Sequence, residues 1–222
     1  MTPRPLVLLD LDGTLTDSAP GIVASARVAY AALGLPAPDE ATLRSFVGPP
    51  LVRSFRAHGV SDERVAEAVS AYRAEFAARG MWDNSVFDGI PEALARLRAA
   101  GVTLLVATSK PTVFAHPITE RFGLAAAVDG VFGAPPDLVA SDKASVIGEA
   151  LASLGSPVDP HRTLMVGDRR HDVAGARAHG IDTLGVAWGY AAPGELEDAG
   201  AVGVVARPAD LADAVLARLR AA

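Results

Sequence analysis

The 222-residue chain contains no cysteine, which excludes disulfide bonds, thiolate metal ligands and a cysteine nucleophile. It lacks any apolar run of about 18 residues, so no membrane-spanning helix is expected. It also lacks a basic excess: the net charge is −6, which argues against nucleic acid or an anionic membrane as a partner. Aromatic residues make up only 5% of a chain that is 50% hydrophobic, so Ala, Val and Leu must form most of the core. We expect one large domain, or a domain with an insert, in the cytoplasm.

A short apolar segment near the N-terminus ends in two acidic residues. Residues 6–9 have the length and composition of a buried strand, and Asp10 and Asp12 follow it closely. Gly13 then permits a turn with positive φ. Ligands of open α/β sheets bind at the carboxyl ends of strands, and two carboxylates crowded there require a cation or a shared proton. An ordinary Asp-Gly turn is the alternative, but the strand and the second carboxylate favour a functional site.

The pattern of apolar residues differs between two parts of the chain. Residues 16–83 are typical of consecutive helices, whereas the later part alternates short apolar runs with helical periodicity. This alternation predicts an α/β fold with a Rossmann-like, doubly wound parallel sheet and helices on both faces. The helical block would then be a small domain inserted after the first strand, and residues 1–15 and 84–222 would form the core domain.

Polar residues also stand at the ends of later predicted strands. Thr108 and Ser109 follow an apolar run at 102–107, where a hydroxyl and free backbone N–H groups suit a phosphate. Simple helix capping is the alternative for both residues. Lys143 stands in the first turn of a predicted helix, which the helix dipole disfavours unless an anion lies nearby. A solvated surface lysine is the alternative there.

A second pair of acids follows the apolar run at 163–166. Asp168 and Asp172 are four residues apart, about one helical turn, so both carboxylates can face one point. Such a pair favours a hard cation such as Mg²⁺, which prefers oxygen ligands. A helix N-cap is the alternative for Asp168. Arg169 and Arg170 either begin a solvated helix or contact a substrate.

The order of these groups along the chain is more specific than any one of them. The order is an acid pair, two hydroxyls, a lysine and a second acid pair. The four motifs of the haloacid dehalogenase-like phosphohydrolases occur in the same order, and the chain resembles this family over essentially its whole length. The resemblance implies that Asp10 is the nucleophile that forms an aspartyl-phosphate, and that Asp12 is the general acid and base. It also implies that the helical block, residues 16–83, is the family's cap domain.

The same resemblance implies which residues bind the phosphate and the metal ion. Thr108, Ser109 and Lys143 would bind the phosphoryl oxygens. The Mg²⁺ ligands would be Asp10, the backbone carbonyl of Asp12, and Asp168, with Asp172 supporting them.

The substrate is less closely defined. Residues 17–22 resemble the phosphoglycolate phosphatase branch, but Arg169 stands where that branch usually has Ser or Thr, as in a 5′-nucleotidase-like subset. We expect Mg²⁺-dependent hydrolysis of a small phosphate monoester, phosphoglycolate phosphatase-like, with nucleoside monophosphates as the alternative substrates. A phosphosugar mutase of the same fold and a receiver-type phosphoacceptor module are further alternatives. A dinucleotide-binding enzyme is disfavoured, because no Gly-x-Gly-x-x-Gly follows the first strand.

Substrate specificity is expected to lie in the helical block. Arg44 and Arg53 flank the loop that contains Gly48 and Pro50, and either arginine could pair with a distal carboxylate or a second phosphate. Arginines on an exposed helix face are the alternative. The expected partner is therefore a small phosphate ester, and the expected assembly is a monomer or a homodimer.

Overall fold

A computed structural model of the protein describes residues 4–135 and 142–221. By its internal contacts the chain forms two compact units: Met1–Thr16 with Val86–Ala222, and Asp17–Ser85. The helical insert expected at 16–83 corresponds closely to the second unit. The two short strands β2 (Thr16–Asp17) and β3 (Ser85–Val86) pair where the chain passes between the units.

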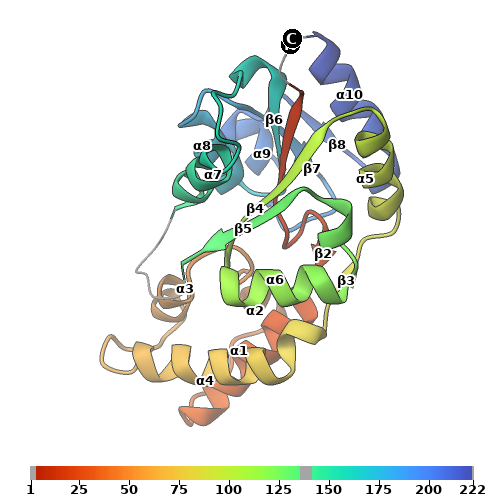
Figure 1. Cartoon of the computed structure of the whole chain (residues 1–222). Helices are drawn as coiled ribbons and strands as arrows, with labels where there is room; N and C mark the ends of the chain where they lie inside the picture. Colours follow the sequence, from red (N-terminus) through yellow and green to blue (C-terminus); the bar gives the residue numbers. More distant parts are fainter. Residues whose placement is uncertain (1–3, 136–141, 222) are drawn as a thin grey trace. The chain divides into compact units, whose positions relative to one another are not determined.

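A six-stranded parallel sheet forms the centre of the larger unit, with the strand order β5-β4-β1-β6-β7-β8 (Figure 1). Its strands are β1 (Leu6–Leu9), β4 (Thr103–Pro111), β5 (Gly130–Ala134), β6 (Thr163–Gly167), β7 (Asp182–Val186) and β8 (Gly203–Val205). From β1 the chain adds β4 and β5 on one side and then β6, β7 and β8 on the other. The direction of winding therefore changes between β1 and β6, where ligands bind in such sheets. The predicted doubly wound α/β fold is confirmed.

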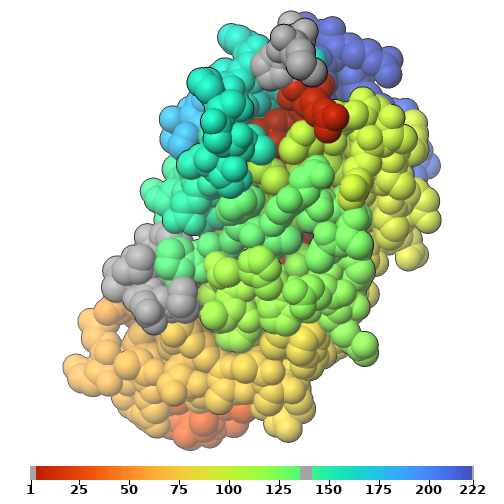
Figure 2. Space-filling model, viewed as in Figure 1, coloured from red at the N-terminus to blue at the C-terminus, as the bar shows by residue number. Residues whose placement is uncertain are grey.

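Helices pack on both faces of this sheet (Figure 1). On one face lie α7 (Lys143–Ala152) and α8 (Arg170–Arg177), and on the other lie α5 (Ile90–Ala99) and α10 (Leu211–Ala221). The remaining helical segments are α6 (Thr112–Arg121), α9 (Glu195–Ala199), η2 (Ala125–Ala127), η3 (Pro160–Arg162) and η4 (Pro208–Asp210). Figure 2 shows α5 and α6 at the surface of this unit. No described helix combines the length and apolar character that a membrane span requires.

Alternating strand residues fill the core beneath α7 and α8. Leu6 and Leu8 point to that side together with Leu105 and Met165, and they pack against Ile147 of α7. All five side chains are almost completely buried. Because side chains alternate along a strand, Val7 and Leu9, also fully buried, face the opposite layer. Strand β1 is thus apolar on both sides, as expected for a central parallel strand.

The Asp17–Ser85 unit is helical, as the sequence predicts. Its elements are α1 (Ala19–Ala32), α2 (Glu40–Arg44), α3 (Leu51–Ala57), α4 (Val65–Ala78) and η1 (Gly80–Trp82). Five aromatic side chains form a connected cluster in its core: Tyr30, Phe46, Phe55, Tyr72 and Phe76. Phe55 is fully buried at the centre of this cluster, with its ring centroid 5.1 Å from that of Phe46.

Replacing Phe55 should destabilise this helical unit. We expect Phe55→Ala to lower its free energy of unfolding by about 3–5 kcal/mol, because the substitution removes buried apolar surface and leaves a cavity. Denaturant unfolding followed by circular dichroism measures the change. Val52→Ala is the matched control on the same helix, since Val52 is 40% exposed, and should cost less than about 0.5 kcal/mol. Equal losses in the two variants would contradict the central position of Phe55.

Candidate active site

The carboxyl ends of β1 and β6 bring the predicted acids together. In the sheet register Leu9 is paired with both Val106 and Val166, so Asp10 emerges level with the end of β6 and beside β4, which continues to Pro111. The backbone N–H of Asp10 donates to the Val166 carbonyl at 2.9 Å and holds the start of the loop against β6. Asp168 follows β6 directly. The two acids therefore flank the point at which the sheet changes its direction of winding.

Asp10, Asp168 and Asp172 form a buried carboxylate cluster. One oxygen of each lies within 4.8 Å of an oxygen of the other two, and the three residues are 8%, 0% and 1% exposed. The Lys143 ammonium lies 2.6 Å from Asp10 Oδ1 and 2.7 Å from Asp172 Oδ1. It also donates to the Ala107 carbonyl at 3.0 Å. Lys143 thus contacts two of the three carboxylates, and the cluster retains an excess of negative charge when all are ionised.

This crowding changes the proton affinities of the cluster. Burial, opposed by Lys143 and assisted by the Asp172 charge, raises the pKa of Asp10 to about 6. Burial also raises the pKa of Asp168, and the neighbouring charges of Asp172 and Asp10 act in the same direction. Burial alone would lower the pKa of Lys143, but the two carboxylates outweigh this effect and leave its pKa above the ordinary value. Lys143 therefore stays protonated in a site that favours a further cation.

Asp168 has one carboxylate oxygen available to such a cation. Its Oδ2 accepts a hydrogen bond from the Tyr190 backbone N–H at 2.8 Å. Its Oδ1 is fully buried and has no hydrogen-bond partner among the described residues. An unpartnered buried carboxylate oxygen is costly, and oxygen ligands of this kind suit Mg²⁺. Asp10 and Asp168 therefore fit the ligand role predicted for them, with Asp172 beside them.

The Asp12 side chain forms an ion pair with a different lysine, Lys110. Its Oδ2 lies 2.8 Å from Nζ of Lys110, a residue that is only 8% exposed. Lys110 is a site residue that we did not single out from the sequence, although it directly follows Thr108 and Ser109. The pair orients the Asp12 side chain, which lies outside the three-carboxylate cluster. The other Asp12 oxygen, Oδ1, is buried and has no hydrogen-bond partner in the described part of the chain.

Thr108 and Ser109 lie within β4, so the capping alternative is wrong for both. The strand continues to Pro111, which is the N-cap of α6. Thr108 is 1% exposed and its Oγ1 accepts a hydrogen bond from the Lys110 N–H at 3.2 Å. Both residues follow Ala107 at the carboxyl end of the strand beside β1. Their phosphate-binding role stays a prediction.

The alternative interpretations of Lys143 as a surface lysine and of Asp168 as a helix N-cap are also wrong. Lys143 is buried in the first turn of α7 and is therefore no solvated surface lysine. The N-cap of α8 is Arg169 and not Asp168. Asp172 stabilises this helix start, because its Oδ2 accepts a hydrogen bond from the Arg169 N–H at 3.0 Å. One oxygen of Asp172 thus caps α8 while the other faces Lys143.

Arg169 and Arg170 converge on a residue that the sequence did not single out. The Arg169 Nε donates to Glu195 Oε1 at 2.9 Å, and the Arg170 backbone N–H donates to the same oxygen at 3.0 Å. The Glu195 side chain is only 6% exposed. The arginine pair therefore ties the start of α8 to the start of α9, a contact that neither sequence interpretation included.

The four predicted specificity residues belong to the Asp17–Ser85 unit. Arg44, Gly48, Pro50 and Arg53 are all exposed. Arg44 Nε lies 3.6 Å from Glu40 Oε1, an exposed ion pair of the kind that contributes little to stability. Their role in substrate choice stays a prediction.

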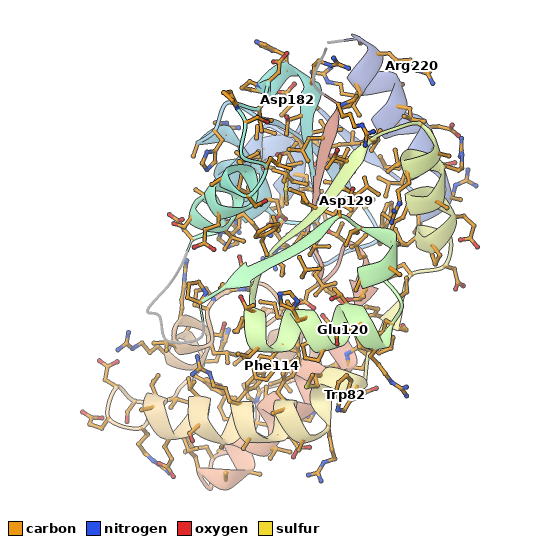
Figure 3. The ribbon with its side chains drawn as sticks, viewed as in Figure 1. Trp82, Phe114, Glu120, Asp129, Asp182 and Arg220 are labelled. Atoms are coloured by element: carbon orange, nitrogen blue, oxygen red, sulfur yellow. The ribbon has the colours of Figure 1, made fainter. Side chains whose placement is uncertain are left out.

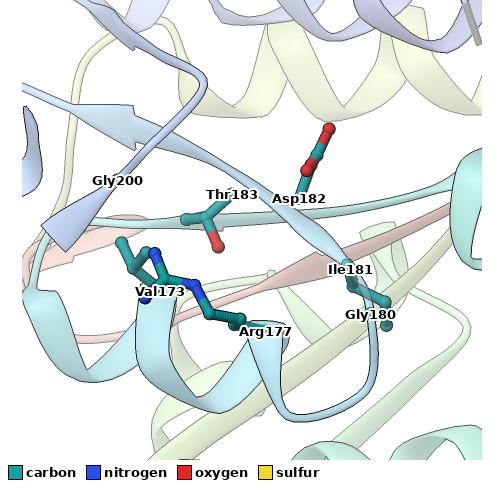
Figure 4. Close-up of a pocket in the computed structure, with 7 residues that line it drawn as sticks. All are labelled: Val173, Arg177, Gly180, Ile181, Asp182, Thr183 and Gly200. Carbon is teal, nitrogen blue, oxygen red and sulfur yellow. The ribbon is translucent and has the colours of Figure 1, made fainter.

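The opposite edge of the sheet also has acidic residues and a hollow, but these acids are not clustered. Figure 3 labels Asp129 and Asp182, which stand before β5 and at the start of β7. Asp129 accepts a backbone hydrogen bond from Leu104 at 2.9 Å, and Asp182 pairs with Arg218 at 2.7 Å. A hollow of about 250 Å³ opens there (Figure 4). Its lining residues are Val173, Arg177, Gly180, Ile181, Asp182, Thr183 and Gly200. None of them belongs to the carboxylate cluster.

The chain combines a parallel sheet with acids at its winding change, a buried lysine, and a helical insert after the first strand. A family model described as haloacid dehalogenase-like hydrolase matches residues 7–186. The chain belongs to this family. The resemblance stated from the sequence motifs is confirmed.

Similar proteins with different names match most of the chain. A tyrosine-protein kinase, PtkA, of Mycobacterium tuberculosis is 50% identical over 185 residues, which are 83% of this chain and 62% of that protein. The chain therefore spans less than two thirds of the length of that relative. A 5′-nucleotidase of Pseudomonas aeruginosa is 42% identical over 193 residues, 86% of each chain. The crystal structure of a predicted phosphatase from Clostridium acetobutylicum is 39% identical, with a TM-score of 0.89 over 97% of this chain and 100% of that one.

The buried Glu195 predicts a pH effect on stability. Despite its burial, hydrogen bonds from the Arg170 N–H and the Arg169 side chain lower the pKa of Glu195 from 4.5 to about 2. The folded state therefore holds this proton more weakly than the unfolded chain. The resulting stabilisation is complete above pH 4.5 and is lost as the pH falls toward 2. We expect the stability difference between wild type and Glu195→Gln, measured by denaturant unfolding, to shrink over this range. The exposed Glu197→Gln control should show no such dependence, and an equal pH dependence in both variants would contradict the assignment.

Proposed function

We propose that the protein is a Mg²⁺-dependent phosphate monoester hydrolase that works through an aspartyl-phosphate on Asp10. The observation that supports this proposal is the buried cluster of Asp10, Asp168 and Asp172 around Lys143. Three carboxylates at the carboxyl edge of a parallel sheet, with only one ammonium group among them, favour a divalent cation and a phosphate together. The same arrangement places a carboxylate nucleophile 2.6 Å from the Lys143 ammonium, which supplies part of the positive charge that a phosphate requires.

Asp10 is positioned for nucleophilic attack. Lys143 holds its Oδ1, which leaves the second oxygen of the same carboxylate for attack on phosphorus. The ester bond to the leaving alcohol breaks as the aspartyl-phosphate forms. Hydrolysis of that acyl phosphate then returns Asp10 and releases inorganic phosphate.

Asp12 transfers the proton in both half-reactions. It stands two residues beyond the nucleophile, and its ion pair with Lys110 fixes the direction of its carboxyl group. In the first half-reaction it would protonate the leaving alcohol, and in the second it would accept a proton from the attacking water.

The remaining groups neutralise and orient the phosphoryl group. Thr108 and Ser109 would donate hydrogen bonds to its oxygens, and Lys143 would neutralise part of its charge. Mg²⁺, held by Asp10, Asp168 and the Asp12 backbone carbonyl, would offset negative charge on the transferring group. Phosphoryl transfer depends more on this positioning and neutralisation than on further covalent chemistry.

Removing the nucleophile tests the proposal most directly. We expect Asp10→Asn to fold normally and to lose phosphatase turnover by about a thousandfold or more, because an amide cannot form the acyl phosphate. Release of inorganic phosphate from p-nitrophenyl phosphate with Mg²⁺ provides the measurement. Asp182→Asn, at the opposite edge of the sheet, is the control and should keep full activity. Near-normal turnover by folded Asp10→Asn would exclude Asp10 as the nucleophile.

For the substrate we propose a small phosphorylated metabolite, with nucleoside monophosphates ahead of phosphoglycolate. The similarity to a 5′-nucleotidase over 86% of both chains supports this order, as does the arginine after Asp168. The catalytic groups would act in the same way on either ester. A phosphosugar mutase would instead return the phosphoryl group to a sugar.

The tyrosine-kinase relative supports a second candidate function. Its 50% identity covers 83% of this chain. In physical terms an aspartyl-phosphate can pass its phosphoryl group to a tyrosyl hydroxyl instead of water, if the acceptor is bound beside Asp10. The two candidates thus share Asp10 and differ in the acceptor of the phosphoryl group.

A substrate panel separates these candidates and tests the predicted specificity residues. Purified protein with Mg²⁺ is offered nucleoside monophosphates, phosphoglycolate, sugar phosphates and, with ATP, a tyrosine-containing peptide. We expect free phosphate from a nucleoside monophosphate at the highest kcat/KM. Arg44→Ala and Arg53→Ala should change the ratios among the esters, while p-nitrophenyl phosphate turnover stays within about threefold, because neither residue belongs to the carboxylate site. Isomerised sugar phosphate would favour the mutase, phosphotyrosine would favour the second candidate, and unchanged ratios would refute the role of the arginines.

A further inference from the structure

The loop at 187–194, between β7 and α9, lies against the carboxylate site. The Trp188 side-chain N–H donates to the Thr14 carbonyl at 3.1 Å, and the Tyr190 backbone N–H donates to Asp168 Oδ2 at 2.8 Å. Gly189 lies so close to Asp168 and Gly13 that a Cβ there would overlap atoms of both. The loop therefore contacts the residues that follow β1 as well as the one that follows β6.

Glu195 anchors the far end of this loop. Its Oε1 accepts hydrogen bonds from the Arg169 side chain and the Arg170 N–H, and its Oε2 accepts one from the Ala192 N–H at 3.1 Å. One nearly buried carboxylate thus joins the start of α8 to the 187–194 loop. Because Arg169 and Arg170 directly follow Asp168, the loop is fixed with respect to the segment that carries the metal-ligand candidate.

The Tyr190 hydrogen bond decides how the Asp168 carboxylate is turned. Asp168 is completely buried, so water cannot replace a lost donor. With Oδ2 held by the Tyr190 N–H, Oδ1 is the oxygen left without a protein partner. Residues that hydrogen-bond to a metal ligand and fix its orientation typically contribute 10–100-fold, roughly, to metal affinity or activity.

We propose that Glu195 is a positioning residue: through the 187–194 loop it holds the Tyr190 N–H against Asp168 and thereby presents Asp168 Oδ1 to a divalent cation. Arg169 takes part as the cationic partner of Glu195. The kinetic consequence rests on the proposed phosphatase function, whereas the effect on metal binding does not.

Two Glu195 substitutions and one neighbouring control test the inference. Glu195→Ala removes all three accepted hydrogen bonds. Glu195→Gln keeps the shape and one acceptor oxygen but loses the charge. Glu197→Ala, an exposed residue on the same helix, is the matched control. The full-length variants are compared in Mg²⁺ titration calorimetry without substrate and in amide hydrogen exchange of Tyr190 without metal.

We expect Glu195→Ala to bind Mg²⁺ about 100-fold more weakly, Glu195→Gln about 10-fold more weakly, and Glu197→Ala unchanged. Exchange of the Tyr190 amide should accelerate in the same order. In the phosphatase assay kcat should fall and the Mg²⁺ requirement rise, while KM changes less than about threefold. A residue that only stabilised the fold would leave Mg²⁺ affinity and Tyr190 protection unchanged at temperatures well below unfolding.

Unchanged Mg²⁺ affinity in whichever Glu195 variant folds overturns the inference, even if that variant is less stable. Wild-type protein that binds Mg²⁺ but hydrolyses no ester overturns the proposed function alone, since the calorimetric comparison still decides the role of Glu195. Wild-type protein that binds no Mg²⁺ overturns both.

Discussion

The contact of the Lys143 ammonium with Asp10 and Asp172 is the interaction on which the candidate site depends. Acids this deeply buried would repel one another and take up protons if no cation lay among them. The Lys143 ammonium lies within 2.7 Å of a carboxylate oxygen of two of them and also donates to the Ala107 carbonyl, so it has three oxygen partners. It does not neutralise the cluster completely. That remaining negative charge favours a second cation at this edge of the sheet, in agreement with the proposed function.

The parallel sheet makes this contact possible. Parallel strands all end at one edge, so residues far apart in the sequence meet there without long loops. Asp10 and Asp168 leave adjacent strands, and Lys143 enters from the first turn of a helix packed on the same sheet. The backbone around each group is held by strand or helix hydrogen bonds. The backbone of the nucleophile candidate is therefore held at the edge of the sheet by its hydrogen bond to Val166.

Local sequence patterns predicted part of this site and missed the rest for a physical reason. Residues 6–9 and the acids after them were predictable because an apolar run, an acid pair and a glycine are all local signals. Thr108 and Ser109 were predicted to follow a strand at 102–107, but β4 continues to Pro111 and includes both, so the capping alternative failed. Glu195 could not be distinguished from Glu197 by any local signal. Only the packing of α9 near the start of α8 makes one of them buried and leaves the other exposed.

Lys110 and Glu195 suggest how the Asp12 carboxylate and the three-carboxylate cluster come to have different surroundings. Lys110 pairs with Asp12 and thereby separates that side chain from the three-carboxylate cluster. Glu195 accepts a hydrogen bond from the Arg169 side chain, although Arg169 is the sequence neighbour of Asp168 and their opposite charges attract. Asp168 Oδ1 has no hydrogen-bond partner among the described residues, which leaves it for the proposed metal ion. The separate roles of these acids therefore depend on which cation each acid contacts and equally on which cation it does not contact.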